Sequence, residues 1–264
     1  MGRVIAIVNQ KGGVGKTTTA VNLAAALAMQ GRPCLLIDVD PQCSATSGVG
    51  VRLGPGEPST YDVLLGESSA EKAIRKTLIP KLQVLGASQD LVGAEIELVN
   101  VEQREQRLKD ALSSLRWRYD FVIIDCPPSL GLVTLNALTA ADALLIPVQC
   151  EYYALEGLTA LISTISLVQQ QLNPEIDIEG LVLTMYDKRN TLCRQVAEDI
   201  QEHFAEKVFR SRIPRNVRLS ESPGHGQPAL TYAPSSKGAT AYEELAAEVA
   251  ERYPARAAAH SNTV

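Results

Sequence analysis

The stretch Q-K-G-G-V-G-K-T-T, from Gln10 to Thr18, decides the fold predicted for this chain. The apolar run from Val4 to Val8 precedes it and predicts a buried strand, and the alanine- and leucine-rich segment from Thr17 to Gln30 predicts a helix. At such a junction, backbone N–H groups and the positive end of the helix converge on a bound phosphate. The sequence therefore predicts a phosphate-binding P-loop, and hence a nucleotide site.

Each part of this loop has an expected role. Glycines leave backbone N–H groups free to approach phosphate oxygens, because no Cβ stands in the way. Lys16 is expected to reach the β- and γ-phosphates, and Thr17 to offer its hydroxyl to the Mg²⁺ that bridges them. A nucleotide with β- and γ-phosphates and Mg²⁺ are therefore the expected ligands of the loop. The predicted nucleotide-binding residues of the loop are Lys11, Gly12, Gly13, Val14, Gly15, Lys16, Thr17 and Thr18.

The loop departs from the pattern G-x-x-x-x-G-K-[ST] in an informative way. Gln10 occupies the first glycine position, and an additional lysine, Lys11, follows it. This is the deviant Walker A form. Lys11 has a simple alternative interpretation as a solvated surface lysine. Because Lys16 already serves the nucleotide of its own chain, we expect Lys11 at the outer lip to neutralise phosphate charge on a facing subunit.

Carboxylates follow two further apolar runs. The run 34–37 ends in Asp38-Val39-Asp40, and the run 121–124, the Walker B strand, ends in Asp125. The carboxyl ends of parallel strands meet at one edge, the edge that also carries the phosphate loop. By strand alternation Asp38 and Asp40 are expected on one side, holding metal-bound waters and orienting an attacking water, although a capped strand end is the alternative. The predicted metal-site residues are Thr17, Asp38 and Asp125, with Asp125 in the second shell, and the predicted catalytic residues are Lys11, Lys16 and Asp40.

The turn after Asp125, C-P-P-S-L-G from Cys126 to Gly131, is stiff and is expected to sense the γ-phosphate. Cys126 raises the alternative of a cysteine nucleophile. Such a nucleophile needs a positioned base, and none of the three histidines falls in a recognisable partner motif. The five cysteines are odd in number and widely spaced, so free thiols are expected rather than disulfides or a cysteine metal site.

Composition and the lack of a linker indicate how the chain is organised. Its 264 residues are 45% apolar and 21% charged, as in an ordinary globular protein, and no linker divides them. We expect one P-loop ATPase domain over residues 1–253 and a disordered tail over 254–264. Met1-Gly2-Arg3 leads directly into the first strand, and no run of eighteen apolar residues occurs, so neither a signal peptide nor a separate N-terminal module is expected. The expected location is cytoplasmic.

The remaining elements alternate between apolar runs and amphipathic segments. This alternation predicts an α/β fold, doubly wound, with a mostly parallel sheet and helices on both faces. The order of the strands cannot be predicted. Beyond those above, the expected strands are 82–85, 143–148 and 180–185, and the expected helices are 61–65, 70–76, 101–115 and a helix with an apolar face between 158 and 172.

Five motifs in order carry a family resemblance over nearly the whole chain. They are K-G-G-V-G-K-T-T from Lys11, L-I-D-V-D-P-Q ending at Gln42, I-I-D-C-P-P-S-L-G ending at Gly131, P-V-Q-C-E-Y-Y-A-L-E-G ending at Gly157 and I-P-R-N-V-R-L-S-E ending at Glu221. The chain resembles short chromosomal ParA/Soj-type partition ATPases, of the deviant Walker A superfamily that also includes MinD. The resemblance implies an ATP-dependent, face-to-face homodimer with Lys11 acting across the interface and Asp40 supporting water attack. It also implies that Pro214 and Asn216 border the adenine.

The function implied by the resemblance is DNA-dependent segregation of a chromosome or plasmid. It implies nucleoid association and hydrolysis stimulated by a ParB/Spo-type partner through the partner's N-terminal peptide. The alternative is a MinD-like, membrane-associated division-site ATPase, which needs a terminal basic amphipathic helix. Residues 252–264 contain Pro254 and few large hydrophobes, so no membrane association is expected. A third interpretation, a relative of iron–sulfur reductases, lacks paired cysteine ligands.

DNA binding has to coexist with a net charge of −5 and a pI of about 5.4. The positive charge must therefore be local: residues 207–218 carry five basic and no acidic residues, and a second cluster starts at Lys188. A solvated basic face is the alternative. The resemblance, in which residues matching Arg189 and Arg218 touch DNA, favours binding to double-stranded DNA of any sequence, although Asn190 stands where the family usually has threonine. The predicted DNA-binding residues are Lys188, Arg189, Arg215 and Arg218.

Overall fold

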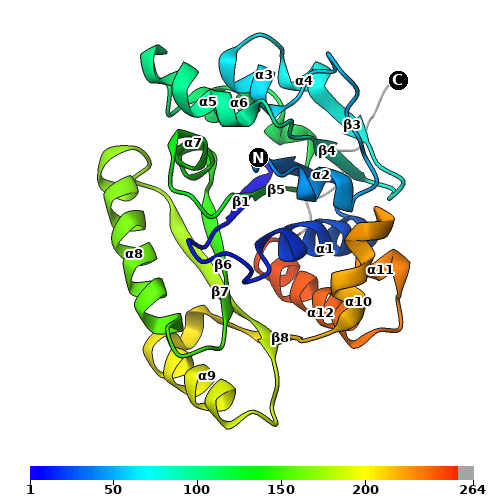
Figure 1. The fold of residues 1–264 in the computed structure, drawn as a ribbon, viewed down its shortest axis with the longest axis vertical. Coiled ribbons are helices and arrows are strands. Elements are labelled where there is room, and N and C mark those ends of the chain that lie inside the picture. The colour runs from blue at the N-terminus through cyan, green and yellow to red at the C-terminus, as the bar shows by residue number, and fades with distance from the viewer. Residues whose placement is uncertain (255–264) are drawn as a thin grey trace, which may run out of the picture.

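The computed structural model describes residues 1–254, so the predicted disordered tail lies outside the described residues except for Pro254. One eight-stranded sheet runs through the molecule in the order β3-β4-β2-β5-β1-β6-β7-β8 (Figure 1). All neighbouring strands are parallel except β3 and β4, which confirms the predicted α/β fold. The strands are β1 (Arg3–Ile7), β2 (Cys34–Asp38), β3 (Ile74–Lys76), β4 (Leu82–Leu85), β5 (Phe121–Asp125), β6 (Ala143–Gln149), β7 (Asp177–Tyr186) and β8 (Val208–Pro214).

Helices cover both faces of this sheet, as predicted, with α1 and α12 on one face and α7 and α8 on the other (Figure 1). Within residues 1–254, no helix combines the length and the hydropathy that a bilayer crossing requires. The α-helices are α1 (Lys16–Met29), α2 (Ser44–Gly48), α3 (Thr60–Leu65), α4 (Ala70–Ala73), α5 (Leu91–Glu97), α6 (Arg107–Ser113), α7 (Leu132–Ala140), α8 (Ala154–Gln171), α9 (Thr191–Phe204), α10 (Val217–Glu221), α11 (Ala229–Tyr232) and α12 (Lys237–Arg252), and the 3-10 turns are η1 (Leu98–Asn100), η2 (Arg116–Arg118), η3 (Ala205–Lys207) and η4 (Ser222–His225).

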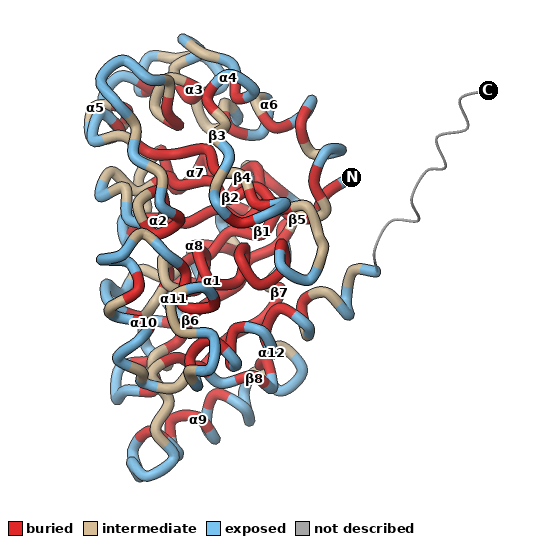
Figure 2. The backbone as a smooth tube through the Cα atoms, turned by 90° about the vertical axis from the view of Figure 1, so that its right-hand side faces the viewer, coloured by how far each residue is buried: buried red, intermediate tan, exposed pale blue. Residues whose placement is uncertain are grey.

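Strand alternation divides the interior into two apolar cores, one on each face of the sheet. In β1, Val4 and Ala6 join the core beneath α5, α7 and α8, whereas Ile5 and Ile7 join the core beneath α1 and α12. Strands β2 and β5 are buried along their whole length (Figure 2). Continuous apolar runs are what a parallel sheet covered on both faces requires, and this explains why these strands are recognisable from sequence.

Two predicted helices differ from the structure. The segment 70–76 is divided, because α4 ends at Ala73 and residues 74–76 pair antiparallel with β4. A seven-residue helix is marginal in water, so pairing with the sheet edge competes successfully. In the segment 101–115 only α6 is helical, and Gln103 has a φ of 53°, which a continuous right-handed helix excludes.

Several elements are not among those predicted from sequence. They are strand β8 and helices α2, α5, α7, α9, α10, α11 and α12. In β8, Phe209, Ser211 and Ile213 are buried, while Arg210 and Arg212 are exposed. Buried and exposed residues alternate here, as they do in an edge strand. Because the exposed residues are arginines, the segment has the sequence of a basic loop, and the strand is not recognisable from sequence. Edge strands carry charges at outward positions because these discourage pairing with another chain.

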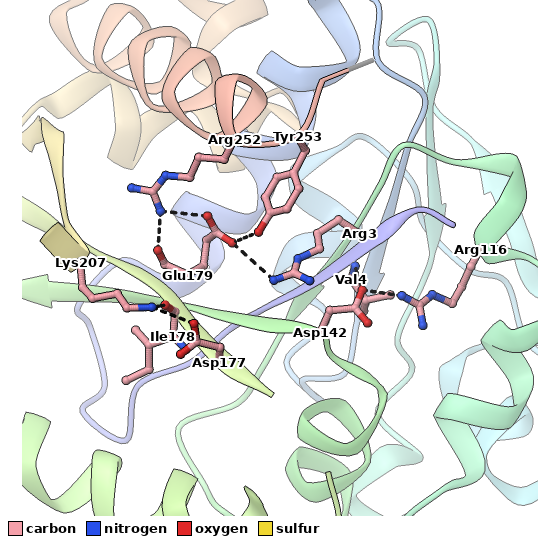
Figure 3. Close-up of polar contacts among 10 residues, drawn as sticks. All are labelled: Arg3, Val4, Arg116, Asp142, Asp177, Ile178, Glu179, Lys207, Arg252 and Tyr253. Carbon is pink, nitrogen blue, oxygen red and sulfur yellow. Dashed lines mark hydrogen bonds and ion pairs between the residues drawn. The ribbon is translucent and has the colours of Figure 1, made fainter. Parts of the chain in front are cut away.

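An ion-pair cluster closes the sheet at the amino ends of its strands, opposite the phosphate loop (Figure 3). Glu179 of β7 has a side chain only 3% exposed and accepts a hydrogen bond from Arg252 at 2.9 Å and another from the Tyr253 hydroxyl. Asp142 accepts the Val4 backbone N–H at 2.8 Å and pairs with Arg116. The contacts of Glu179 attach the end of α12 to the sheet. The carboxyl ends of the strands, at the opposite edge, carry the phosphate loop.

Candidate nucleotide site and nucleic-acid interface

The phosphate loop spans the gap between the end of β1 and the start of α1. Gly13 and Gly15 have φ angles of 75° and 90°, left-handed values that strain any residue with a Cβ. Thr184, a buried residue of β7, donates its hydroxyl hydrogen to the Val14 carbonyl oxygen at 2.8 Å. The loop therefore owes its shape to its own glycines and to a contact with a distant strand.

Lys16 lies inside the loop, with only 7% of its surface exposed. Its Nζ donates to the Lys11 carbonyl oxygen at 3.0 Å. Burial lowers the pKa of Lys16, and the nearby negative charges of Asp125 and Asp40 oppose this effect. The structure thus brings together the predicted lysine and the two predicted carboxylate strands at one edge.

Asp38 is completely buried at the end of β2 and is well supplied with donors. Its Oδ2 accepts the Thr46 backbone N–H at 2.8 Å and the Thr46 hydroxyl at 2.7 Å. Burial raises the pKa of Asp38 to about 6, although these hydrogen bonds act in the opposite direction. Asp38 is therefore a fixed carboxylate whose position depends on α2.

Asp40 is near Asp38 for a different reason from the one predicted. Strand β2 ends at Asp38, so strand alternation does not extend to Asp40. Instead, the Asp40 backbone N–H donates to Asp38 Oδ1 at 3.1 Å, and Asp40 Oδ1 accepts the Gln42 N–H at 2.9 Å. Asp40 therefore fits both interpretations, because it forms the hydrogen bonds of a turn and also lies close to Asp38.

Asp125 differs from Asp38, because neither of its buried oxygens has a hydrogen-bond partner among residues 1–254. Burial raises the pKa of Asp125 well above its usual value, the Asp38 charge adds to this, and the nearby Thr17 hydroxyl offsets it only in part. A buried carboxylate without donors is costly, and a cation relieves that cost. Carboxylate and hydroxyl oxygens are ligands that Mg²⁺ accepts directly or through water, so these residues fit a magnesium ion.

A cavity of about 380 Å³ opens beside the loop. It lies between the loop and the segment that follows β8, and Asn216 at its wall caps α10 by accepting the Arg218 N–H at 2.8 Å. The structure therefore places both predicted adenine-bordering residues next to the phosphate loop. Residues that line the cavity include Gly15, Thr18, Thr184, Pro214 and Asn216.

Lys11 is exposed at the outer lip, as predicted. Its ammonium group forms an ion pair with Glu151 at 2.6 Å, and its backbone N–H donates to Asn9 Oδ1 at 3.0 Å. Beyond Glu151, Tyr152 and Tyr153 are 75% and 67% exposed. Two large exposed aromatic rings beside an exposed lysine form a surface suited to a protein partner.

The predicted DNA-binding residues lie where β7 and β8 end, since Tyr186 and Pro214 are register partners there. Arg189 pairs with Asp187 at 2.9 Å, and Arg218 pairs with Glu221 at 2.8 Å. Lys188 and Arg215 are also exposed at this end.

Two other basic residues of the stretch 207–218 lie apart from these four, whereas Arg212 stacks on the Tyr186 ring at 4.6 Å. Lys207 is at the opposite end of β8 and pairs with Asp177 at 2.8 Å. Arg210 pairs with two glutamates of α12, Glu248 and Glu251, both at 3.4 Å. The stretch that is continuous in sequence is therefore divided in space, and only part of it belongs to the candidate DNA surface.

The turn after Asp125 is tied to a helix that sequence patterns do not predict. Glu95 of α5 accepts the backbone N–H groups of Leu132 at 2.7 Å and Val133 at 3.3 Å, so it caps the start of α7. A Cβ at Gly131 would collide with the Glu95 carboxylate, so a larger residue there would displace this side chain. Burial raises the pKa of Cys126 well above its usual range, which argues against a thiolate nucleophile.

Sequence reasoning misses four residues that shape the site. Thr184 has a detectable signal, because it is a polar residue inside an apolar strand, and Glu151 lies in a quoted motif without an assigned role. The others depend on contacts between distant segments that no local pattern encodes. The four residues are Thr46, Glu95, Glu151 and Thr184.

Comparison with known proteins agrees with this geometry. The model of a family described as "AAA domain" matches residues 2–178. The chain is 54% identical over 250 residues to the sporulation initiation inhibitor protein Soj of Bacillus subtilis, which covers 95% of this chain and 99% of Soj. It is 52% identical over 252 residues to the chromosome partitioning protein ParA of Myxococcus xanthus, covering 96% and 89%.

A solved structure of a relative contains the two expected cofactors, a nucleotide and magnesium. A protein of Mycobacterium smegmatis named cobyrinic acid a,c-diamide synthase, with bound ADP and magnesium, is 41% identical, covers 96% of each chain and has a TM-score of 0.83. A related chain of the same fold thus holds a nucleotide and Mg²⁺. Given the phosphate loop, the carboxylate edge and an identity above one half to Soj and ParA along nearly its whole length, this chain belongs to the ParA/Soj family of chromosome-partitioning ATPases.

Proposed function

We propose that this partition ATPase forms a face-to-face homodimer when it binds ATP, and that the dimer binds double-stranded DNA without sequence preference. Residues 1–253 act as a single P-loop ATPase domain. The observation that carries the proposal is the contrast between two lysines of one loop. Lys16 is buried inside the loop, near enough to Asp125 and Asp40 to feel their charge, whereas Lys11 is exposed and pairs with Glu151.

The site's own residues divide the work of binding and hydrolysis. The loop N–H groups and Lys16 hold the phosphates, and Pro214 and Asn216 border the base. Thr17, Asp38 and Asp125 would hold Mg²⁺ directly or through water, and the ion would supply positive charge to the phosphates. Asp40, at the mouth of the carboxylate edge, orients the attacking water.

Dimerisation gives Lys11 a new partner. In the single chain its ammonium group is neutralised by Glu151. The two side chains are 41% and 48% exposed, so water screens the pair, which contributes little stability and is easily exchanged. A γ-phosphate of the nucleotide on a facing chain carries more negative charge than the Glu151 carboxylate, and it lies in a site that excludes water. Lys11 therefore stabilises the dimer and the charge that develops during phosphoryl transfer.

DNA binding follows because the dimer presents two copies of the basic surface at the ends of β7 and β8. One chain offers Lys188, Arg189, Arg215 and Arg218 on a protein of net charge −5. Two chains in one dimer offer twice as many phosphate contacts at fixed spacing, which raises affinity steeply. The protein acts in the cytoplasm on the nucleoid, and the N-terminal peptide of a ParB/Spo-type partner stimulates hydrolysis.

The decisive experiment measures ATP hydrolysis with duplex DNA and the ParB-type protein of the same genome, added singly and together. Strong stimulation that needs both activators is expected. Anionic phospholipid vesicles form the contrasting arm, because a MinD-like ATPase responds to lipid instead. Stimulation by vesicles and none by DNA with the ParB-type protein would refute the proposal.

A further inference from the structure

Helix α5 and the turn η1 that continues it are apolar on two sides. The outer side carries Val92, Ile96 and Val99, spaced by four and three residues and exposed by 66%, 75% and 48%. We call these three residues the α5 stripe. The inner side is formed by buried core residues, namely Leu91, Ala94 and Leu98.

A surface helix of a monomeric protein needs only one apolar face. Large aliphatic residues at adjacent helical positions on the water side form a contiguous patch, and such patches mark binding surfaces. Single exposed hydrophobes need no such explanation. The α5 stripe therefore indicates a partner that covers it.

The charge around the stripe specifies that partner. From Asp90 to Glu105 the chain carries five carboxylates and one cation. The one cation, Arg104, is paired with Glu105 at 2.8 Å, while Asp90, Glu97 and Glu102 are exposed. The surface is thus apolar in the middle and negative at its border, which excludes DNA and fits a segment with aliphatic side chains and positive charge.

We propose that the α5 stripe binds a basic amphipathic segment of the activating partner, with its aliphatic residues on Val92 and Ile96 and its cations on the surrounding carboxylates. The inference rests on the proposed function, in which a ParB-type partner stimulates hydrolysis. This mode of recognition, an amphipathic segment on an apolar strip with a charged border, recurs among protein–peptide complexes.

The stripe is connected to the nucleotide site through Glu95. This side chain belongs to α5, accepts the N–H groups of Leu132 and Val133, and approaches Gly131 closely. Those residues directly follow the turn that begins at Cys126, next to Asp125. A partner seated on α5 therefore acts on that turn through Glu95, which is a positioning residue rather than a catalytic one.

The test uses full-length protein with ATP, Mg²⁺, duplex DNA and the ParB-type protein of the same genome. In the double variant Val92→Asp/Ile96→Asp, two carboxylates replace the aliphatic contacts and add like charge to the border. Binding of the ParB-type protein and its stimulation of hydrolysis should fall more than tenfold, which corresponds to the loss of more than about 1.4 kcal/mol. Basal hydrolysis, ATP-dependent dimerisation and DNA binding should stay at the parental level.

The matched control is Leu78→Asp. Leu78 is 91% exposed in the turn between β3 and β4. Strand β3 lies apart from α5 (Figure 1), so this replacement should change neither binding nor stimulation. Charge reversal gives a second variant that leaves the apolar stripe intact. Glu102→Lys should weaken binding of the ParB-type protein and make that binding less sensitive to salt, and unchanged binding would contradict the charge argument.

The outcomes separate the inference from the function on which it rests. If the parental protein is stimulated and the double variant is stimulated equally, the α5 inference is wrong and the proposed function stands. If the parental protein does not respond to DNA and the ParB-type protein, both are wrong. Loss of ATP-dependent self-association in the double variant, followed by light scattering, would show that a second copy covers the stripe and would overturn the inference.

Glu95→Gln tests the connection to the turn. The amide keeps the size of the side chain but is a weaker acceptor for the two α7 N–H groups. Binding of the ParB-type protein and the KM for ATP should stay unchanged, whereas the stimulated kcat should fall several-fold more than the basal kcat. An equal fall in both rates would assign Glu95 a purely structural role.

Discussion

Asp38 and Asp125 are register partners at the carboxyl ends of β2 and β5. Of these two carboxylates, only Asp38 accepts hydrogen bonds from other groups within residues 1–254. Both side chains are completely buried. The carboxyl edge of the sheet therefore holds an unsatisfied carboxylate beside a satisfied one. Such an arrangement reduces stability at the place where the proposed function needs a cation, as is common at functional sites.

Replacing Asp125 by Asn should stabilise the nucleotide-free protein at neutral pH by at least ~1 kcal/mol, because it removes a buried carboxylate without donors. Burial raises the pKa of Asp125 in the folded chain, so above about pH 4 the folded state binds more protons than the unfolded state. Wild-type stability consequently falls as pH rises through this window. The advantage of the Asp125→Asn variant should disappear toward pH 4, as measured by urea unfolding at pH 4 to 8.

The same substitution should abolish the stabilisation that Mg²⁺ adds to ATP. In the parental protein, Mg²⁺ with ATP should raise Tm more than ATP with EDTA does, because the ion compensates the Asp125 charge. In the Asp125→Asn variant the two conditions should give similar Tm values. A variant that is less stable than the parent without nucleotide at pH 7 would contradict the interpretation of Asp125 as an unpaired carboxylate.

Lys11→Ala should separate nucleotide binding from dimerisation. Lys11 is exposed and contacts Glu151 of its own chain, so the monomer should bind ATP with nearly parental affinity in calorimetry. The ATP-dependent dimer should be lost in light scattering, because the proposed phosphate partner of Lys11 lies on the facing chain. A normal dimer population would count against that role.

Lys16→Ala provides the contrast for this experiment. Lys16 is buried inside the loop, and its loss should weaken ATP binding between about 10- and 100-fold, the range for a charge-assisted contact. At ATP concentrations that saturate only the parental protein, dimerisation should then fail because the variant binds too little ATP. Equal affinities of the parental and Lys16→Ala proteins for ATP would place the phosphates somewhere else.

Asp40→Ala should retain Mg²⁺ and ATP but lose the oriented water. The Asp40 side chain accepts the Gln42 N–H within its own turn, whereas Asp38 keeps its separate bonds to Thr46 in the variant. Hydrolysis should fall about 100-fold or more, the usual contribution of a group that handles the proton of the nucleophile. A long-lived ATP dimer should accumulate on size-exclusion chromatography, and hydrolysis at the parental rate would make Asp40 a turn residue only.

Much of this fold is encoded locally. The P-loop follows from glycines and lysine between a strand and a helix. Strands β2 and β5 follow from four-residue runs that are apolar because both faces of the sheet are covered. The carboxylates at their ends follow from the rule that parallel strands end at one edge. These features need no knowledge of distant contacts, which is why they can be predicted.

Other features depend on tertiary structure. The ion pair of Lys11 joins segments 140 residues apart, and Glu95 caps a helix that begins 37 residues later. Strand β8 exists because β7 and α12 flank it, although its arginines resemble a basic loop. The apolar outer side of α5 likewise becomes visible only when its inner side is known to face the core.

DNA binding should be independent of sequence, dependent on ATP and carried by Arg189 and Arg218. In the free chain each guanidinium is paired with a nearby carboxylate, Asp187 or Glu221, and both pairs are exposed. Hydrogen bonds from Arg189 lower the pKa of Asp187 to about 2, so this carboxylate stays ionised at neutral pH. DNA phosphates must therefore displace it, and a single chain should bind weakly.

In the ATP dimer each arginine is present twice. Replacing Arg189 or Arg218 by Ala should weaken binding about equally on unrelated duplexes and flatten the slope of log K against log[salt] by about 1.8, since each lost phosphate contact contributes about 0.9. Lys207→Ala is the matched control, because Lys207 belongs to the same basic stretch but lies at the opposite end of β8, paired with Asp177. The salt slope of the Lys207→Ala variant should equal that of the parental protein. If Arg189→Ala and Arg218→Ala, still dimeric with ATP, kept the parental slope on random duplex DNA, the basic end of β7 and β8 would not be the DNA surface.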